Sequence, residues 1–79
     1  ENPTPTFGVR NARVSVRKRF GKDQSHLRLL LENRVEGIYW RGASRLSTDR
    51  MEADVVFQVE VDGMTGRPVL NIKDLGRLF

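Results

Sequence analysis

The stretch Phe20–Glu32, FGKDQSHLRLLLE, decides the fold of this chain. It begins with a run of turn-forming residues at positions 21–25, which includes a glycine, an aspartate and a serine. It ends with a strand pattern over His26–Glu32 that has leucine at every second position: Leu27, Leu29 and Leu31. Because successive side chains of a strand point to opposite faces, these leucines predict a strand with one apolar face.

The run before this turn, Ala12–Phe20, alternates in the same way. Its even positions include Val14 and Val16 and predict the buried face, whereas Arg13, Ser15, Arg17 and Arg19 occupy the odd positions. Val14 and Val16 also disfavour a helix, because β-branched side chains lose rotamer freedom there. The two runs together predict a long antiparallel hairpin with one aliphatic face and one arginine-bearing face.

Three further strands are predicted at Val35–Arg41, Asp54–Val61 and Pro68–Leu75. Gly37 inside the third strand marks a bulge or a sharp bend. The segment Gly42–Met51 has no alternating pattern and is predicted to form a short helical link.

The alternation also predicts which side chains fill the core. In the third strand Trp40 shares its parity with Ile38 and is expected inside, so Tyr39 is expected on the outer face. Phe20 and Phe57 are expected in the core. The inward positions of the last two strands are expected to be Val55, Phe57, Val59, Val61, Leu70 and Ile72.

Three strands, a short link and two more strands favour a small closed barrel, because closure removes exposed strand edges. The predicted class is all-β, and the predicted fold is the five-stranded Greek-key barrel called the OB-fold. A chain of 79 residues makes a single domain. We expect residues 1–7 to be a linker, residues 8–76 the OB-fold domain and residues 77–79 a C-terminal tail.

Composition excludes several classes of function. The chain has no cysteine and one histidine, so neither a thiol site nor a convincing catalytic triad or histidine metal cluster can be assembled. We therefore expect no catalytic residue, no cofactor and no metal in this chain. No apolar run approaches the roughly 20 residues of a membrane span, and no signal peptide is visible. A cytoplasmic location without membrane contact is expected.

The charge is unevenly distributed along the chain. The net charge is +4 overall, and the basic excess lies within residues 1–41. Most of the basic residues are arginine, whose planar guanidinium binds phosphate through two hydrogen bonds and stacks on bases. This distribution is typical either of a nucleic-acid-binding surface or of an ordinary solvated arginine-rich face.

The order and spacing of several short motifs resemble the C-terminal OB-fold domain of bacterial RecJ, a family of 5′→3′ exonucleases specific for single-stranded DNA. The resemblance runs from Asn2 to about Leu75. The matching motifs are Asn2-Pro3-x-Pro5-x-Phe7, Gly21-Lys22, His26-Leu27-Arg28-Leu29, Glu36-Gly37-Ile38-x-Trp40, Asp54–Val61, Gly66-Arg67 and Leu70-x-Ile72-Lys73-Asp74-Leu75. The chain departs from the family at Trp40, where Phe is frequent, and at Thr65, where a basic residue is usual.

The resemblance implies a module that binds single-stranded DNA for nuclease domains of the same polypeptide, in DNA repair and recombination. The catalytic motifs of the family are absent from this chain, so its divalent metal, Mn or Mg, is expected in the parent nuclease core. Residues 1–7 would then connect to the preceding nuclease domain. The fragment itself is expected to be monomeric.

The candidate nucleic-acid-binding residues combine the arginine face, the first turn and the outward aromatic side chain. They are Arg13, Arg17, Arg19, Lys22, His26, Arg28, Tyr39 and Arg41. Lys22 suits either a phosphate contact or a plain turn, and Tyr39 either a base-stacking or a rim position. His26 suits either base or phosphate contact or a surface strand position. The alternative for the whole chain is a structural or protein-interaction module without direct DNA contact.

Overall fold

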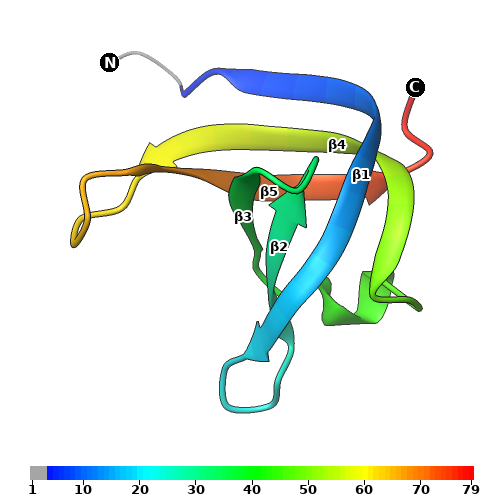
Figure 1. Ribbon diagram of the computed structural model, residues 1–79, viewed down its shortest axis with the longest axis horizontal. Coiled ribbons are helices and arrows are strands. Elements are labelled where there is room, and N and C mark those ends of the chain that lie inside the picture. Colours follow the sequence, from blue (N-terminus) through cyan, green and yellow to red (C-terminus); the bar gives the residue numbers. More distant parts are fainter. Residues whose placement is uncertain (1–3) are drawn as a thin grey trace.

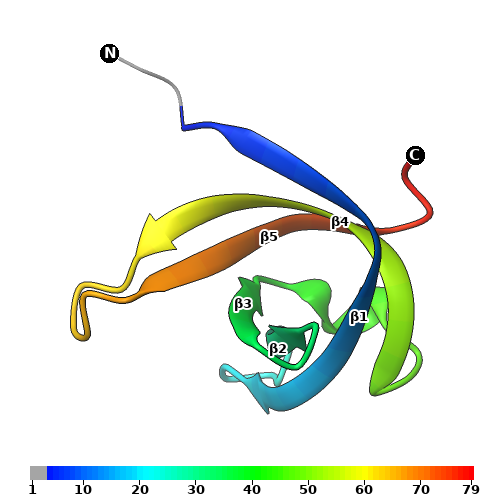
Figure 2. The same cartoon turned by 45° about the horizontal axis from the view of Figure 1, so that its top comes forward.

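A computed structural model describes residues 4–79 of the chain. It contains the strands β1 (Thr6–Phe20), β2 (His26–Leu31), β3 (Val35–Tyr39), β4 (Arg50–Val61) and β5 (Pro68–Gly76). They close into a barrel in the order β1-β2-β3-β5-β4, as Figures 1 and 2 show. The predicted five-stranded OB-fold is confirmed. The helical link between β3 and β4 is a single 3₁₀ turn, η1 (Gly42–Arg45), and the described residues contain no α-helix.

The long strand β1 pairs with two different strands of the barrel. Its first half pairs with β4 and its second half with β2, and the strand curves strongly between them (Figure 1). The register shifts between Val9 and Ala12 and again between Val16 and Lys18. Such bulges bend and twist a strand, and here they let one strand follow the closed wall of the barrel.

Strands β4 and β5 run together beyond the barrel and end in a projecting hairpin, visible in both views (Figures 1 and 2). The predicted core positions Val59 and Val61 are 43% and 71% exposed because they lie on this projecting part. Phe57 is half-buried and stacks on Phe7, with ring centroids 5.8 Å apart. Predicting Val59 and Val61 as core residues was therefore wrong, and Phe57 packs only against the margin of the core.

The core is formed by small and aliphatic side chains and one tyrosine, which come from all five strands and from the link to β4. Leu27 and Leu29 of β2 and Val55 of β4 are fully buried. The remaining buried members are Ala12, Val14, Leu31, Tyr39, Leu46, Ala53, Ile72 and Leu75. The prediction that the leucines of β2 face inward is confirmed, whereas Phe20 lies outside this cluster and is only half-buried.

The pairing of β2 with β3 reverses the predicted roles of Tyr39 and Trp40. Tyr39 lies directly opposite the buried Leu27 and therefore faces the interior. Tyr39 is 6% exposed, whereas Trp40, one residue further on, is 52% exposed. The prediction of a buried Trp40 and an outward Tyr39 was wrong, because residues opposite one another in an antiparallel pair share a face.

Gly37 allows the barrel to close tightly. A side-chain carbon at this position would lie 3.0 Å from Cδ1 of Ile72 and 3.2 Å from Cδ1 of Leu31. The β2–β3 register is regular through Gly37, so of the two alternatives predicted there, a bulge or a sharp bend, the bulge is absent. Strand β3 joins β5 in parallel at only two positions, Gly37 opposite Leu70 and Ile38 opposite Asn71.

A buried carboxylate joins three distant parts of the chain. Oδ1 of Asp54 accepts a hydrogen bond from the Asn11 N–H at 3.0 Å, and Oδ2 accepts bonds from the Leu78 and Phe79 N–H groups at 3.0 and 3.1 Å. The Asp54 side chain thus holds the first bulge of β1 and the C-terminal tail against β4. These hydrogen bonds lower the pKa of Asp54 below its ordinary value of 3.8, the Asn11 bond contributing most.

The predicted linker lies partly outside the described part of the chain, because residues 1–3 are not described. Of its other residues, Thr6 and Phe7 are already part of β1. The proposed domain boundaries stay predictions. Within residues 4–79, no helix is long and apolar enough to cross a membrane.

Leu29→Ala and Leu30→Ala test the assigned faces of β2 with two neighbouring leucines. Leu29 is fully buried, so its truncation is expected to lower the free energy of unfolding by about 2–5 kcal/mol. Leu30 points outward and its truncation should lower that free energy by no more than about 1 kcal/mol. Urea unfolding followed by circular dichroism measures both values. Equal losses would contradict the register described above.

Asp54→Asn tests the buried carboxylate through the pH dependence of stability. A carboxylate with a lowered folded-state pKa stabilises the fold above its ordinary pKa of 3.8, and this contribution disappears as the pH falls through the folded-state value. The variant should therefore melt several degrees below the unmodified chain at pH 7, and the difference should shrink as the pH falls below 3.8. Thermal melts from pH 7 to pH 2 measure it. A difference that does not change with pH would refute this role of Asp54.

Candidate nucleic-acid interface

The candidate site lies on the outer face, which we define as the side of β1, β2 and β3 turned away from the barrel interior. Strand pairing arranges its residues in rows across the three strands. One row joins Ser15, Leu30 and Glu36, and the next joins Lys18, Arg28 and Ile38. A third row, at the end near the β1–β2 turn, brings together Phe20, His26 and Trp40.

The bulge of β1 at residue 17 changes which basic residues share this face. Before the bulge the odd positions, such as Arg13, point outward, but after it Lys18 lies opposite Arg28 and Arg19 lies opposite the buried Leu27. Arg19 instead forms an ion pair with Asp49 at 3.6 Å. The prediction that Arg13, Arg17 and Arg19 lie on one face was wrong for Arg19, and Lys18 takes its place.

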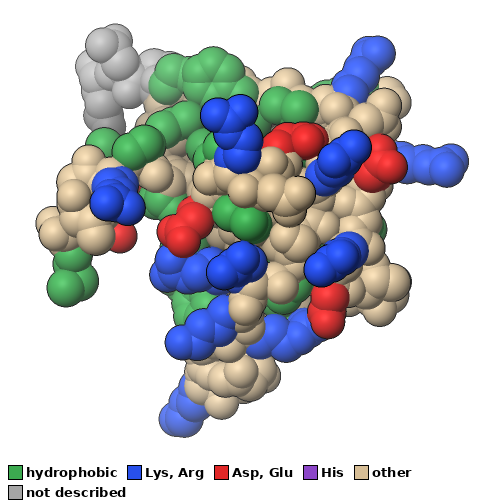
Figure 3. Space-filling model, viewed as in Figure 1, with side chains coloured by type: hydrophobic (Ala, Val, Ile, Leu, Met, Phe, Trp, Pro, Cys, Tyr) green, Lys and Arg blue, Asp and Glu red, His purple; other side chains and the backbone are tan. Residues whose placement is uncertain are grey.

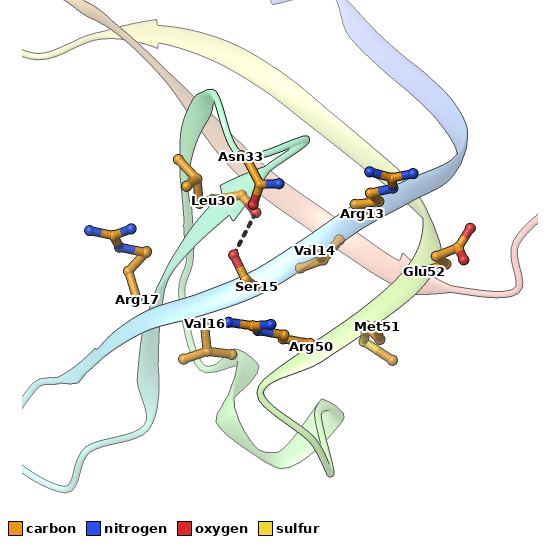
Figure 4. A pocket seen from close by; sticks show the side chains of 10 residues that line it. All are labelled: Arg13, Val14, Ser15, Val16, Arg17, Leu30, Asn33, Arg50, Met51 and Glu52. Carbon is orange, nitrogen blue, oxygen red and sulfur yellow. Dashed lines mark hydrogen bonds between the residues drawn. The ribbon is translucent and has the colours of Figure 1, made fainter.

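An open groove crosses β1 beside these rows. Figure 4 shows the side chains of Arg13, Ser15, Arg17 and Asn33 around it, together with Arg50, which is contributed by β4. The groove has a volume of about 890 Å³. The Ser15 hydroxyl, on its floor, donates to the Leu30 carbonyl at 3.4 Å. Three guanidinium groups and two small polar side chains provide donors that suit an anion, and the lining also includes the Glu52 carboxylate.

Positive charge gathers over the β1–β2 hairpin, where Figure 3 shows a concentration of Lys and Arg side chains. Arg28 pairs with Glu36 at 3.2 Å, which neutralises part of it. Glu52 lies opposite Arg13 across the β1–β4 pairing. Within residues 4–79 no ion pair involves Arg17, Lys18 or Arg50. This part of the face therefore carries a net positive charge that is open to ligands.

The third row forms an aromatic cluster beside the cations. The ring centroid of Trp40 lies 5.6 Å from that of Phe20 and 5.0 Å from that of His26, both in edge-on geometry. Phe20 and His26 are themselves 5.4 Å apart. Trp40 is 52% exposed, so a large part of its ring faces solvent while two neighbours hold it in place.

Backbone groups fix the position of His26 in this cluster. Its Nδ1 accepts a hydrogen bond from the Arg41 N–H at 2.9 Å, and Arg41 adopts a left-handed conformation with φ 60°. On the other side, a side-chain carbon at Gly21 would lie 2.5 Å from the His26 ring. Gly21 also has φ 96°, so both the turn and the close packing of His26 favour glycine there.

The remaining candidates fall in two groups. Lys22 and Arg41 are exposed in segments that flank the aromatic cluster. Tyr39 is buried beneath it, and burial raises the pKa of its hydroxyl above 10.0. Tyr39 is therefore not a residue of the outer face, and the prediction that it could stack a base there was wrong.

The sequence analysis missed three residues of the candidate site: Trp40 and Lys18 on the outer face, and Arg50 of β4 beside it. Trp40 could have been found by aligning the leucines of β2 with the odd positions of β3, since opposite residues share a face. Lys18 and Arg50 carried no such signal. Their positions depend on the bulge at residue 17 and on β4 starting at Arg50, four residues before the predicted start at Asp54.

A second groove lies between the β2–β3 pair and the projecting β4–β5 hairpin. Its volume is about 840 Å³, and it is lined by residues of both signs. Arg28, Arg34 and Arg67 contribute positive charge, whereas Glu36, Glu60 and Asp62 contribute negative charge. This mixed lining makes it a weaker candidate for an anionic ligand than the groove across β1.

A family model described as the RecJ OB domain matches residues 1–74 of the chain. No curated protein matches it. Within the described residues, no three His, Asp or Glu side chains come close enough to hold a metal ion.

Quenching of tryptophan fluorescence tests both the exposure of Trp40 and the sign of the charge around it. Trp40 is the only tryptophan of the chain, so the signal has a single source. Relative to their quenching of free tryptophan, iodide should quench Trp40 more strongly than caesium, because the neighbouring cations attract anions. The difference should shrink between about 20 mM and 500 mM total salt, as screening increases. Protection of Trp40 from both ions would contradict the exposed position.

Proposed function

The chain belongs to the family of RecJ OB domains, and we propose that it binds single-stranded DNA on the outer face of β1, β2 and β3. In the parent polypeptide this binding positions the strand for a nuclease core that lies outside the chain, during DNA repair and recombination. The 5′→3′ exonuclease chemistry and its divalent metal, Mn or Mg, belong to that core in this proposal.

The observation that carries the proposal is the combination of aromatic and cationic side chains on one sheet face. Single-stranded DNA offers exposed bases and a phosphate on every nucleotide. Proteins that bind it combine a positively charged track with aromatic side chains on which bases stack. The outer face has Trp40 at one end and Lys18 and Arg17 further along the strands, and Arg50 of β4 lies beside it in the groove.

Most of the affinity is expected from phosphate neutralisation. The basic side chains available for this on or beside the face are Arg13, Arg17, Lys18, Lys22, Arg28, Arg41 and Arg50. Contacts to phosphates carry no sequence information, so base preference should be weak. The aromatic row and the row of Leu30 lie four residue steps apart along β2, a distance of about 13 Å. We therefore expect a site near the short end of the roughly 4–16 nucleotides that OB folds cover.

A second candidate function is a structural role between domains of the parent polypeptide. It is favoured by apolar side chains that stay exposed at the start of β1 and on the β4–β5 hairpin: Phe7, Val9, Val59, Val61 and Met64. Charge reversal of Arg13 and Arg17 in the full-length enzyme distinguishes the two roles. Loss of DNA affinity supports the DNA-binding role, whereas unchanged affinity with loss of stability or of a partner supports the structural one.

Titration of this chain into a fluorescein-labelled oligo-dT tests the proposal directly. Anisotropy should show binding at low salt, and the logarithm of the association constant should fall linearly with the logarithm of salt concentration. The slope for single strands is about −0.7 for each phosphate neutralised. No binding at low salt, or binding that salt does not weaken, would refute the proposal.

Lys18→Ala and Lys73→Ala form a matched pair for this titration. Both lysines are exposed strand residues: Lys18 follows the register shift in β1, and Lys73 lies within the register shift between β4 and β5. Only Lys18 lies on the outer face. Lys18→Ala should weaken binding several-fold and reduce the steepness of the salt dependence by about 0.7. Lys73→Ala should change neither. An equal effect of both substitutions would mean that the overall charge, and not this face, attracts DNA.

A further inference from the structure

We infer that the second groove, which lies between the β2–β3 pair and the projecting β4–β5 hairpin, binds an extended peptide segment of a partner protein. The peptide lies along the edge of β3 that faces the hairpin and takes the place of a strand between β3 and β5. The groove borders the outer face, but its occupant is a protein, so the inference goes beyond the proposed function and does not depend on it.

The first argument is the point at which β3 and β5 separate. Their parallel pairing starts at Gly37 and Leu70 and covers two residue pairs only. Val35 and Glu36 come before Gly37 in β3 and pair with β2, but among residues 4–79 no residue of β5 pairs with them. Both residues also line the groove. The edge of β3 is therefore open to another strand at the place where the groove lies.

Strand β5 leaves its own edge open at the same place. Its first two residues, Pro68 and Val69, pair with β4, whereas within the described part of the chain neither pairs with β3. Pro68 has no N–H group to donate to a strand beside it. Two strand edges thus border a groove of about 840 Å³, and a peptide strand between them can hydrogen-bond to main-chain groups, as in β-strand addition.

The second argument is the apolar surface on both walls of the groove. Val35 of β3 is 44% exposed, and Val61 of β4, on the opposite wall, is 71% exposed. Leu30, Pro68 and Val69 also line the groove. Successive side chains of an extended peptide point in opposite directions, so every second one can bury an apolar group against this surface.

The third argument is the charge around the groove. Arg34 and Arg67 contribute positive charge, and within residues 4–79 neither forms an ion pair. Glu60 and Asp62 contribute negative charge on the hairpin wall. These carboxylates repel a phosphate backbone, whereas a peptide can present one acidic and one basic side chain to the two signs. The partner segment is therefore one in which apolar residues alternate with charged residues of both signs.

An NMR titration of the isotope-labelled chain with the acetylated hexapeptide Val-Lys-Val-Glu-Val-Lys tests the inference. The amide signals of Val35, Glu36 and Val69 should shift most, and the shifts should saturate at millimolar peptide. Absence of saturable shifts at these residues would refute the peptide site.

Two further peptides test the role of the backbone. Each has the same side chains but is N-methylated at every second amide, so that one of its two edges can no longer donate hydrogen bonds. The peptide methylated on the edge that faces β3 should bind about 5- to 150-fold more weakly, which corresponds to the loss of two hydrogen bonds. Equal affinity of all three peptides would exclude strand addition and overturn the inference.

Val61→Ser and Val9→Ser form a matched pair of chain variants. Both valines are at least 42% exposed, but only Val61 lines the groove. Val61→Ser should weaken binding of the hexapeptide several-fold, because an apolar contact is lost, and Val9→Ser should not change it. An equal effect of the two substitutions would place the peptide outside the groove and overturn the inference.

Oligo-dT in the same NMR titration separates this inference from the proposed function. It should shift signals of the outer face, such as that of Lys18, and leave those of Val61 and Val69 unchanged. Shifts of Val61 and Val69 by oligo-dT, with none by the hexapeptide, would assign the groove to DNA and refute the peptide site while the proposed function stands. Binding of the hexapeptide without any binding of oligo-dT would support the peptide site and refute the proposed function.

Discussion

The leucines of β2 that face the barrel interior determine which side chains of both neighbouring strands face water. Leu27 and Leu29 are fully buried, and each is paired on both sides. Because paired residues share a face, their burial turns Tyr39 and Gly37 inward and leaves Trp40 outside. A shift of one residue in either pairing would exchange the two faces completely. The outer face is therefore a consequence of core packing as much as of its own composition.

The alternating pattern was sufficient to predict the class, the strand order and most of the core. The strands deviate from a strict alternation at the bulges of β1 and at the register shift between β4 and β5, and the wrong face predicted for Arg19 follows from one of these deviations. One extra residue at position 17 exchanges the faces of Lys18 and Arg19. A bulge depends on how three strands fit around a closed wall, and the residues at that position carry no local signal for it.

The arrangement of the candidate residues was predicted only in part, and not all of the errors come from the bulges. Arg13 and Arg17 line the groove across β1 and Arg28 lies opposite Lys18, but a role of these arginines in binding stays a prediction. Tyr39 was predicted on the outer face and Trp40 in the core because the alternation was counted within β3 alone. The leucines of β2 that lie opposite β3 were not considered. The exposure of Val59 and Val61 could not be predicted from the alternation of apolar residues. A strand that extends beyond the barrel keeps this alternation although no second layer of side chains covers its apolar face.

The short contact between β3 and β5 has a consequence for motion. The barrel is closed there by two residue pairs only, whereas β1, β2 and β4 are joined along most of their lengths. Openings of lowest free energy are expected where the fewest backbone hydrogen bonds must break. Separation of β3 from β5 would expose the interior to water and leave β1, β2 and β3 joined to one another. Strands β3 and β5 can thus separate while the surface that carries Trp40 keeps its shape.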